Sequence, residues 1–506
     1  MRFPSSRSKL LILCLLLISS VIGGTYVALI KWAPGVAAGR ASLGRTGVAA
    51  AQDDCSDGIN VPNRYNRPFC VRPDELFIFA VNYRPFEFGG ETPERNAGRF
   101  FETVIGARLR ETFPNMKIKY ATWDYPVRYE DLVTAGVVPD IILENPHNRI
   151  DRDLEPRGWV ADMTPMIAAS GIDLSQLNRG AVEMVRSRSD GGMYGVPIFI
   201  DEFMLFYNKK IFDKFHVSYP TVGMTYDEAY CLAAKLTRQS GLDAYKGYLQ
   251  HPDSYLTFNQ LGLYPFQPTT SEEPPAADII VDITTPAWRD LAENIDRFLQ
   301  IPRNTFTTVD DYLKGDMSRP GHVAMAVNTL SKLPMYAGND LFVDPLNRAQ
   351  VLGWLPSIEL GITSVPVLRQ GSKTIYQPNM LAAFIPPQSN KKDQAIAVVK
   401  WMVSEPAQIE LSRHAIKGVL QTPAVISSFG AAIPELAGID TSAVYWGRNA
   451  VVKNYHNTEY WDIPLFSAFR QHVLRDGMTP QSSLIVTEQE DIPTYIRNRA
   501  AAGQTW

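Results

Sequence analysis

The stretch from Gly192 to Lys214 reads GMYGVPIFIDEFMLFYNKKIFDK and carries the strongest fold information in the chain. It contains two adjacent carboxylates, Asp201 and Glu202. Adjacent side chains on an extended chain point in opposite directions, so this pair alone does not supply two facing carboxylates for glycoside hydrolysis.

Strands and helices alternate on both sides of it. Hydrophobic spacing predicts strands at 75–81, 116–120 and 140–143 and helices at 98–112 and 129–135. This order is typical of βαβ units and a mainly parallel sheet. The alternation continues with helices at 226–237, 286–299 and 393–403 and strands at 322–327 and 350–355. Thr225 and Glu228 have capping-box spacing, and Ser389 or Asn390 is expected to cap the last helix.

Composition excludes several classes of protein. The chain has 506 residues, of which 45% are hydrophobic and 20% charged, which is ordinary for globular domains. A net charge of −4 argues against a nucleic-acid partner, and a mean hydropathy of −0.12 excludes a polytopic membrane protein. No Gly-x-Ser-x-Gly, phosphate-loop or His-Glu-x-x-His motif occurs, so neither a cofactor nor a metal is expected.

The N-terminal region indicates export. Residues 1–30 form a basic and then apolar segment, which is either a signal sequence or an uncleaved membrane anchor. The anchor is preferred because no sharp cleavage pattern follows the apolar core. Residues 31–71 resemble a linker, within which Cys55 and Cys70 either form a disulfide or remain free thiols. Cys231 lies in a helical pattern and is predicted to be a buried free thiol.

The stretch from Gly192 to Lys214 resembles the signature region of bacterial extracellular solute-binding proteins of the maltodextrin-binding type. In that family a Gly-aromatic-Gly-x-Pro turn leads into a strand that ends in Tyr-Asn, followed by a short helix and a lysine. The positions that fit are Pro197, Ile198, Tyr207, Asn208, Phe212 and Lys214. Phe199 and Met204 stand where small or polar residues are usual, which marks an outlying member.

Five flanking segments agree with the family in order and spacing, so that the resemblance covers about residues 72 to 495. They are Val138–Ile142, Gly158–Pro165, Thr225–Glu228, Gly321–Ala326 and Lys400–Ser404, the last followed by Gly418 and Pro423.

The resemblance implies an α/β, two-lobed fold of the type II periplasmic-binding-protein kind. Mixed, mainly parallel sheets are wrapped by helices, and a hinge of crossing segments joins the lobes. The crossings are expected near Pro197–Glu202, Pro356–Val365 and Lys417–Pro423. The N-terminal lobe would comprise 72–198 and 360–416, the C-terminal lobe 199–359 and 417–495, and the tail 496–506.

The family's cleft positions and the loops after predicted strands nominate ligand contacts. A sugar site needs flat aromatic faces and planar hydrogen-bonding groups. The candidates are Tyr83, Arg84, Glu144, Asn145, Asp201, Tyr255, Phe258, Asn328, Trp461 and Arg470. Each has an alternative role in packing or as a solvated surface group. Arg470 stands where the family often has a tryptophan, and Thr329–Ser331 lacks another.

The function that the resemblance implies is the substrate-binding component of an ABC importer. It would hold an oligosaccharide outside the cytoplasm, do no chemistry and deliver its solute to permease subunits. An anionic or polar compound held by Arg84 and Arg470 is the second ligand class. The other functions considered are a glycoside hydrolase using Asp201 or Glu144, and a partner that presents solute to a membrane sensor.

Overall fold

The computed structural model describes residues 55–64, 66, 68–80, 101–123, 126–147, 150–189, 191–241, 243–265, 281–304, 322–337, 355–452 and 465–501. They belong to one compact unit, Asp53–Trp506. The predicted signal sequence or anchor at 1–30, most of the predicted linker and all but the last residue of the predicted strand at 350–355 lie outside these ranges. Leu355 itself begins a 3₁₀ turn (Leu355–Ser357). No helix within them is long and apolar enough to cross a membrane.

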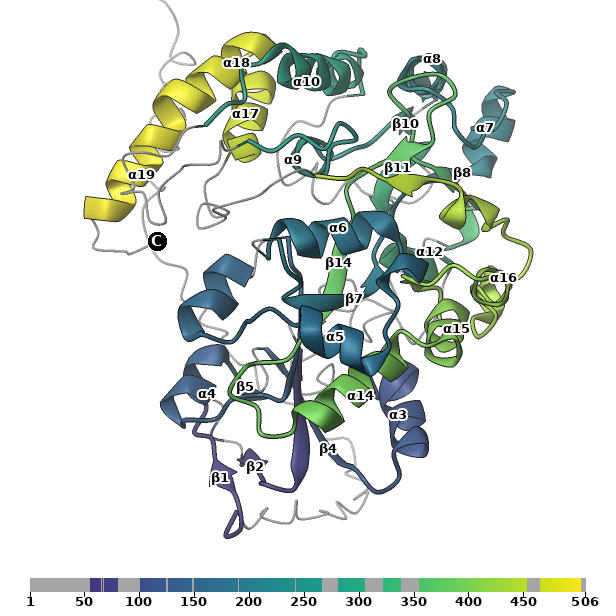
Figure 1. Ribbon diagram of the computed structural model, residues 1–506. Coiled ribbons are helices and arrows are strands. Elements are labelled where there is room, and N and C mark those ends of the chain that lie inside the picture. The colour runs from purple at the N-terminus through teal and green to yellow at the C-terminus, as the bar shows by residue number, and fades with distance from the viewer. Residues whose placement is uncertain are drawn as a thin grey trace, which may run out of the picture. The chain divides into compact units, whose positions relative to one another are not determined.

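A seven-stranded sheet organises the first half of the unit (Figure 1). Its order is β15 (Lys417–Gly418), β7 (Gly195–Ile200), β14 (Met380–Phe384), β6 (Ile141–Glu144), β3 (Glu75–Ala80), β4 (Lys117–Trp123) and β5 (Pro126–Val127). Strands β6, β3, β4 and β5 pair in parallel, which confirms the predicted βαβ units. Strands β14 and β15 run antiparallel to their neighbours, so the sheet is mixed.

Helices surround this sheet and enclose its core. They are η2 (Phe101–Gly106, a π-helical turn), α3 (Ala107–Thr112), α4 (Tyr129–Thr134), α5 (Thr164–Ser170), α6 (Arg179–Ser187), α14 (Lys392–Met402) and α15 (Glu405–Arg413). Asn178 starts α6 by accepting a 3.0 Å hydrogen bond from the Ala181 amide. Ser389 does not occupy the cap position of α14, but its hydroxyl accepts from the Lys391 amide at 3.1 Å.

A second, antiparallel sheet has the order β11 (Met325–Thr329), β8 (Phe203–Asn208) and β12 (Leu360–Ser364). Short pairs accompany it, namely β9 (Arg238–Ser240) with β10 (Asp243–Tyr245) and β13 (Thr374–Ile375) with β16 (Arg448–Asn449). The predicted strand at 322–327 is present but begins at Met325. Strands β8 and β12 are buried along their whole length and β11 at Met325 and Ala326, so this sheet lies at the centre of a second core.

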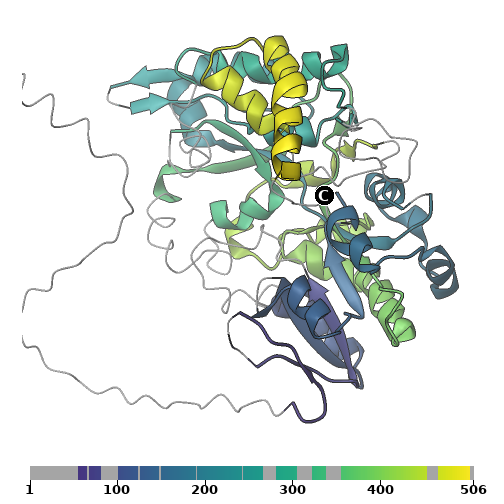
Figure 2. The same ribbon diagram turned by 90° about the vertical axis from the view of Figure 1, so that its left-hand side faces the viewer.

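Helices also cover the second sheet. They are α7 (Lys209–Phe215), α8 (Tyr226–Leu236), α9 (Pro252–Thr257), α10 (Pro286–Leu299), α12 (Leu333–Ala337), α16 (Pro423–Ser427), α17 (Leu465–Leu474), α18 (Pro480–Val486) and α19 (Ile492–Ala501). Helices α17 and α18 lie beside α10 in both views (Figure 2). The predicted capping box of α8 is confirmed, because the Thr225 amide donates to Glu228 at 2.7 Å and its hydroxyl accepts from the Glu228 amide at 3.2 Å.

Two hydrophobic clusters divide the unit into two lobes. The first cluster takes buried residues from 61–200 and 380–419, and the second from 203–376 and 433–492. The exceptions are Ala415, which belongs to the second cluster, and Val452, which belongs to the first. The chain therefore returns to the first cluster at Met380, later than the predicted boundary at residue 360. The reason is that β12 pairs along its whole length with β8, which holds 360–364 in the second cluster.

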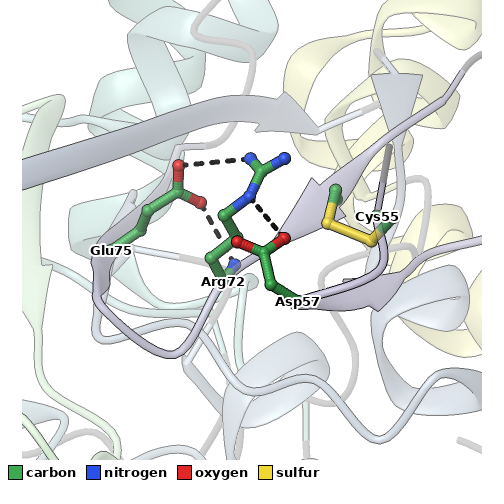
Figure 3. Close-up of a disulfide and its surroundings, with 5 residues drawn as sticks. Cys55, Asp57, Arg72 and Glu75 are labelled. Carbon is green, nitrogen blue, oxygen red and sulfur yellow. Dashed lines mark hydrogen bonds and ion pairs between the residues drawn. A yellow bond between two sulfur atoms is a disulfide. The ribbon is translucent and has the colours of Figure 1, made fainter. Parts of the chain in front are cut away.

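A disulfide fastens the start of the first lobe. Cys55 is bonded to Cys70 (Figure 3), which decides between the disulfide and the free thiols that the sequence left open. Cys70 lies in β2 (Cys70–Val71), paired antiparallel with β1 (Ile59–Asn60). Beside the bridge, the Arg72 Nε donates to Asp57 at 2.9 Å, and the Arg72 amide donates to Glu75 at 3.1 Å.

The predicted burial of Cys231 is wrong. Its thiol is free and exposed. Helix α8 buries Tyr226, Ala229, Ala233 and Leu236, which recur at helical spacing on one face, and Cys231 lies on the opposite face.

Candidate functional site

One edge of the seven-stranded sheet gathers polar side chains at the junction of the lobes. Strands β6 and β7 end there and β14 begins there, because Glu144 pairs with Ala382 and Ile200 pairs with Met380. The residues just beyond this edge contact one another. The Asn145 side-chain amide donates to the Asn379 side chain at 3.0 Å, and the Asp201 amide donates to the Asn379 carbonyl at 2.7 Å.

Asp201 joins this edge to the second lobe. Its carboxylate accepts hydrogen bonds from the Ser331 amide at 2.8 Å and the Ser331 hydroxyl at 3.0 Å. Ser331 lies in a 3₁₀ turn (Leu330–Lys332) that follows β11. Burial raises the pKa of Asp201 to about 6, against the opposing effect of these hydrogen bonds. The carboxylate also lines a small hollow between the lobes, together with Leu330, Pro334, His414 and Lys417.

Glu202 points the other way, as expected for its neighbour on an extended chain. Its carboxylate accepts from the Lys417 ammonium at 2.8 Å and from the Asn449 side-chain amide at 2.9 Å. The exposed fraction is 1% for the Glu202 side chain and 0% for that of Lys417. Glu202 therefore binds together a crossing segment, the sheet edge of the first lobe and strand β16. The adjacent carboxylates do not face each other across a cleft.

A ring stack also spans the lobe junction. The His147 ring, which follows β6, lies 4.8 Å from the Phe258 ring at the end of α9. The His147 backbone amide donates to the Asn145 side chain at 2.9 Å, which holds that side chain in position. Burial, with a smaller effect of the Arg188 charge, lowers the pKa of His147 to about 3. The ring is consequently neutral at physiological pH.

Two predicted contact residues lie in the cores of the lobes. Glu144 is fully buried, where it accepts from the Tyr129 hydroxyl at 2.6 Å and from the Asn145 amide at 2.8 Å. Tyr255 is fully buried, and its hydroxyl accepts from the Asn294 side chain at 2.7 Å. Both hold their lobes together, and neither presents a free surface to a solute.

The remaining predicted residues are spread over the second lobe or lie outside the described ranges. Asn328 is partly buried on β11, and its side chain donates to the Tyr336 hydroxyl at 3.1 Å. Arg470 on α17 is buried and lies 2.8 Å from His251 and 3.1 Å from Asp253. Tyr83, Arg84 and Trp461 are outside the described residues.

A second hollow between the lobes was not anticipated from the sequence. It is a pocket of about 560 Å³ at the start of α6, walled by residues of both lobes and of the last crossing segment. Its polar lining comes from residues that share no motif. These lining residues come together because β16 packs against the start of α6. A 3.2 Å hydrogen bond between the Asn178 and Asn449 side chains joins the two elements.

Comparison with known families agrees with this architecture. Residues 92–409 match the family described as bacterial extracellular solute-binding protein. The match spans well over half of the chain, so the chain belongs to that family. The family's description makes its members extracellular proteins that bind solutes.

Solved structures show the same two-lobed fold at low sequence identity. The ABC substrate-binding protein of Listeria monocytogenes in complex with cycloalternan superposes with a TM-score of 0.56 at 17% identity, covering 85% of this chain and 99% of that one. A sugar transporter from Rhizobium etli, in an open conformation, gives 0.60 at 16% identity, covering 82% and 98%. UgpB from Mycobacterium tuberculosis, in complex with glycerophosphocholine, gives 0.55 at 14% identity, covering 84% and 99%. No curated protein matches this chain by sequence.

Proposed function

We propose that this protein is the extracytoplasmic substrate-binding component of an ABC importer, and that it captures an oligosaccharide between its lobes without altering it. The observation that carries the proposal is the polar edge where Asn145 and Asp201 both contact Asn379 and Asp201 reaches the second lobe through Ser331. Carboxylates and amides bind sugar hydroxyls well, and a neighbouring aromatic face such as that of Phe258 packs on the sugar ring. The cycloalternan complex of the Listeria protein supports the ligand class.

The three residues take distinct roles in this proposal. Asp201, ionised above a pKa of about 6, accepts hydroxyl hydrogen bonds. Asn145 both donates and accepts, and Phe258 supplies the flat surface. Tyr83, Arg84, Asn328 and Trp461 remain proposed contacts from the family pattern. Asp201 has internal partners but also lines the hollow between the lobes, whereas Glu144, Tyr255 and Arg470 are buried among partners of their own lobes, so we assign these three to positioning and not to direct contact.

Capture proceeds by closure of the lobes. The chain crosses between the two clusters after Ile200, after Tyr376 and after Val419, which supplies a hinge of three segments. The closed form would then dock on permease subunits, and the segment at 1–30 would direct export or tether the protein to the membrane. The non-enzymatic role is supported by the separation of Asp201 from Glu202, whose carboxylates have different partners in different directions.

A thermal-shift screen against a glycan library tests the ligand class. A solute at one hundred times its dissociation constant should stabilise the protein by about 2.7 kcal/mol. Asp201→Asn and Asn145→Ala should each reduce the shift, whereas Asp393→Asn, which alters an exposed carboxylate at the start of α14, should leave it unchanged. A response to anions or peptides, and to no glycan, would contradict the oligosaccharide assignment.

A further inference from the structure

The pocket at the start of α6 has a distinctive charge. Arg179 and Arg448 both line it, Arg179 from the first lobe and Arg448 from the second. None of its lining residues is acidic. Over the described part of the chain neither guanidinium has an ion-pair partner. Two unpaired guanidiniums facing one hollow form a site of positive potential.

Hydrogen-bonding groups complete the lining. Asn178, Gln421 and Thr374 contribute amide and hydroxyl groups beside the two arginines. Helix α6 begins at the pocket with nine residues, Arg179–Ser187, so the positive end of its dipole adds to the field. Arginine forks and helix N-termini are both suited to phosphate and carboxylate oxygens.

The wall of the pocket is firmly built. Asn449 is only 7% exposed, and its side-chain amide donates to the Glu202 carboxylate at 2.9 Å and to the Tyr376 carbonyl at 3.1 Å. A Cβ at Gly180 would come within 2.7 Å of the Asn449 Cβ, so only glycine permits α6 to approach β16 this closely. The backbone of this wall and the Asn449 side chain are therefore held in place before any ligand arrives, which lowers the entropy cost of binding for the part of the site that they form.

We propose that this pocket is a second binding site, for a small molecule that carries a phosphate or carboxylate group, and that it is separate from the solute cleft. Its ligand would bridge Arg179 and Arg448 and thus the two lobes. Glu202 lies between the two hollows. Its carboxylate accepts from Asn449, which lines the pocket, and from Lys417, which lines the hollow beside Asp201. A ligand held by both walls favours the lobe arrangement in which the walls are nearest, and so couples to closure.

Calorimetric titration of the full-length protein with inorganic phosphate and with citrate, at constant ionic strength, tests this site. The two probes distinguish a phosphate ligand from a carboxylate ligand. We expect saturable binding of at least one, weakened roughly tenfold or more by Arg179→Gln or Arg448→Gln and lost in the double variant. Arg238→Gln, which removes an exposed charge on β9, is the matched control and should bind as the wild type does.

Both arginines are exposed at the surface, so the variants are expected to fold, and circular dichroism would check this. Asp201→Asn should retain anion binding while weakening solute binding, so failure of this proposal is distinguishable from failure of the proposed function. The proposal is overturned if neither anion binds saturably, if the double variant binds as tightly as the wild type, if Arg238→Gln abolishes binding, or if Asp201→Asn does so.

Discussion

The buried ion pair of Glu202 and Lys417 gives the sharpest stability prediction. The Lys417 ammonium lies 2.8 Å from the carboxylate, and both side chains are excluded from water. Lys417→Met removes the charged donor and leaves the carboxylate with the Asn449 amide and its neighbouring backbone amide, that of Phe203 at 3.2 Å. Breaking a buried pair from one side costs about 3–5 kcal/mol, because the remaining charge is uncompensated.

The assay is urea unfolding of the wild type, Lys417→Met, Glu202→Gln and the double variant. Each single variant should lose about 3–5 kcal/mol, whereas the double variant should recover much of that loss, because it leaves no unpaired charge. Lys400→Met, at an exposed position on α14, is the matched control. A loss below about 1 kcal/mol in Lys417→Met would refute the reasoning, since it would place the pair in the range of exposed ion pairs.

Three further outcomes are expected. The double variant Cys55→Ser/Cys70→Ser should lose about 3 kcal/mol, because the bridge closes a loop with a sequence separation of 15; unchanged urea unfolding would contradict this. His147 has its pKa lowered from 6.5 to about 3, so the unfolded state alone takes up this proton as pH falls. Its contribution to stability is therefore complete above pH 6.5 and is lost progressively below it, by up to about 1.4 kcal/mol per pH unit. The free energy of unfolding of His147→Phe should depend less on pH between pH 4 and 6.5 than that of the wild type. An identical pH dependence would disprove the effect. Gly361→Ala places a Cβ 2.1 Å from the Tyr207 ring, so calorimetry should show a loss of about 1–3 kcal/mol, and an unchanged melting temperature would count against this packing.

Local patterns in the sequence predicted much of the first lobe. The strands β3, β4 and β6 and the intervening helix α4 lie within a few residues of their predicted bounds. Hydrophobic period and chain order suffice there because neighbouring elements in the sequence are also neighbours in the sheet. The capping box of α8 was likewise readable, since its two residues are three positions apart and interact directly.

Long-range pairing explains what the sequence did not predict. The return crossing was placed too early because β12 pairs with β8 from more than one hundred residues away, and no local pattern reports that partner. Glu144 ends β6, where a cleft residue is expected, but its carboxylate is buried in the core and accepts a hydrogen bond from Tyr129 on helix α4. Arg470 similarly meets Asp253 only in the folded chain.

Within the site, position along the sheet was predicted better than contacts. Asn145 was nominated because it follows a predicted strand, and Asp201 because the family resemblance places an acidic contact there. The sheet does bring both to one edge beside Asn379. Neither the Ser331 contact that joins Asp201 to the second lobe nor the ring stack of His147 had a sequence signal. Both depend on how the lobes meet.

Equilibrium titration of the protein with the solute found by screening, followed by mass spectrometry of the recovered solute, tests the central claim most directly. The account predicts one saturable site, weakened in Asp201→Asn, and a solute recovered with its mass unchanged. A solute that is cleaved, or affinity that does not depend on Asp201 and Asn145, would contradict it.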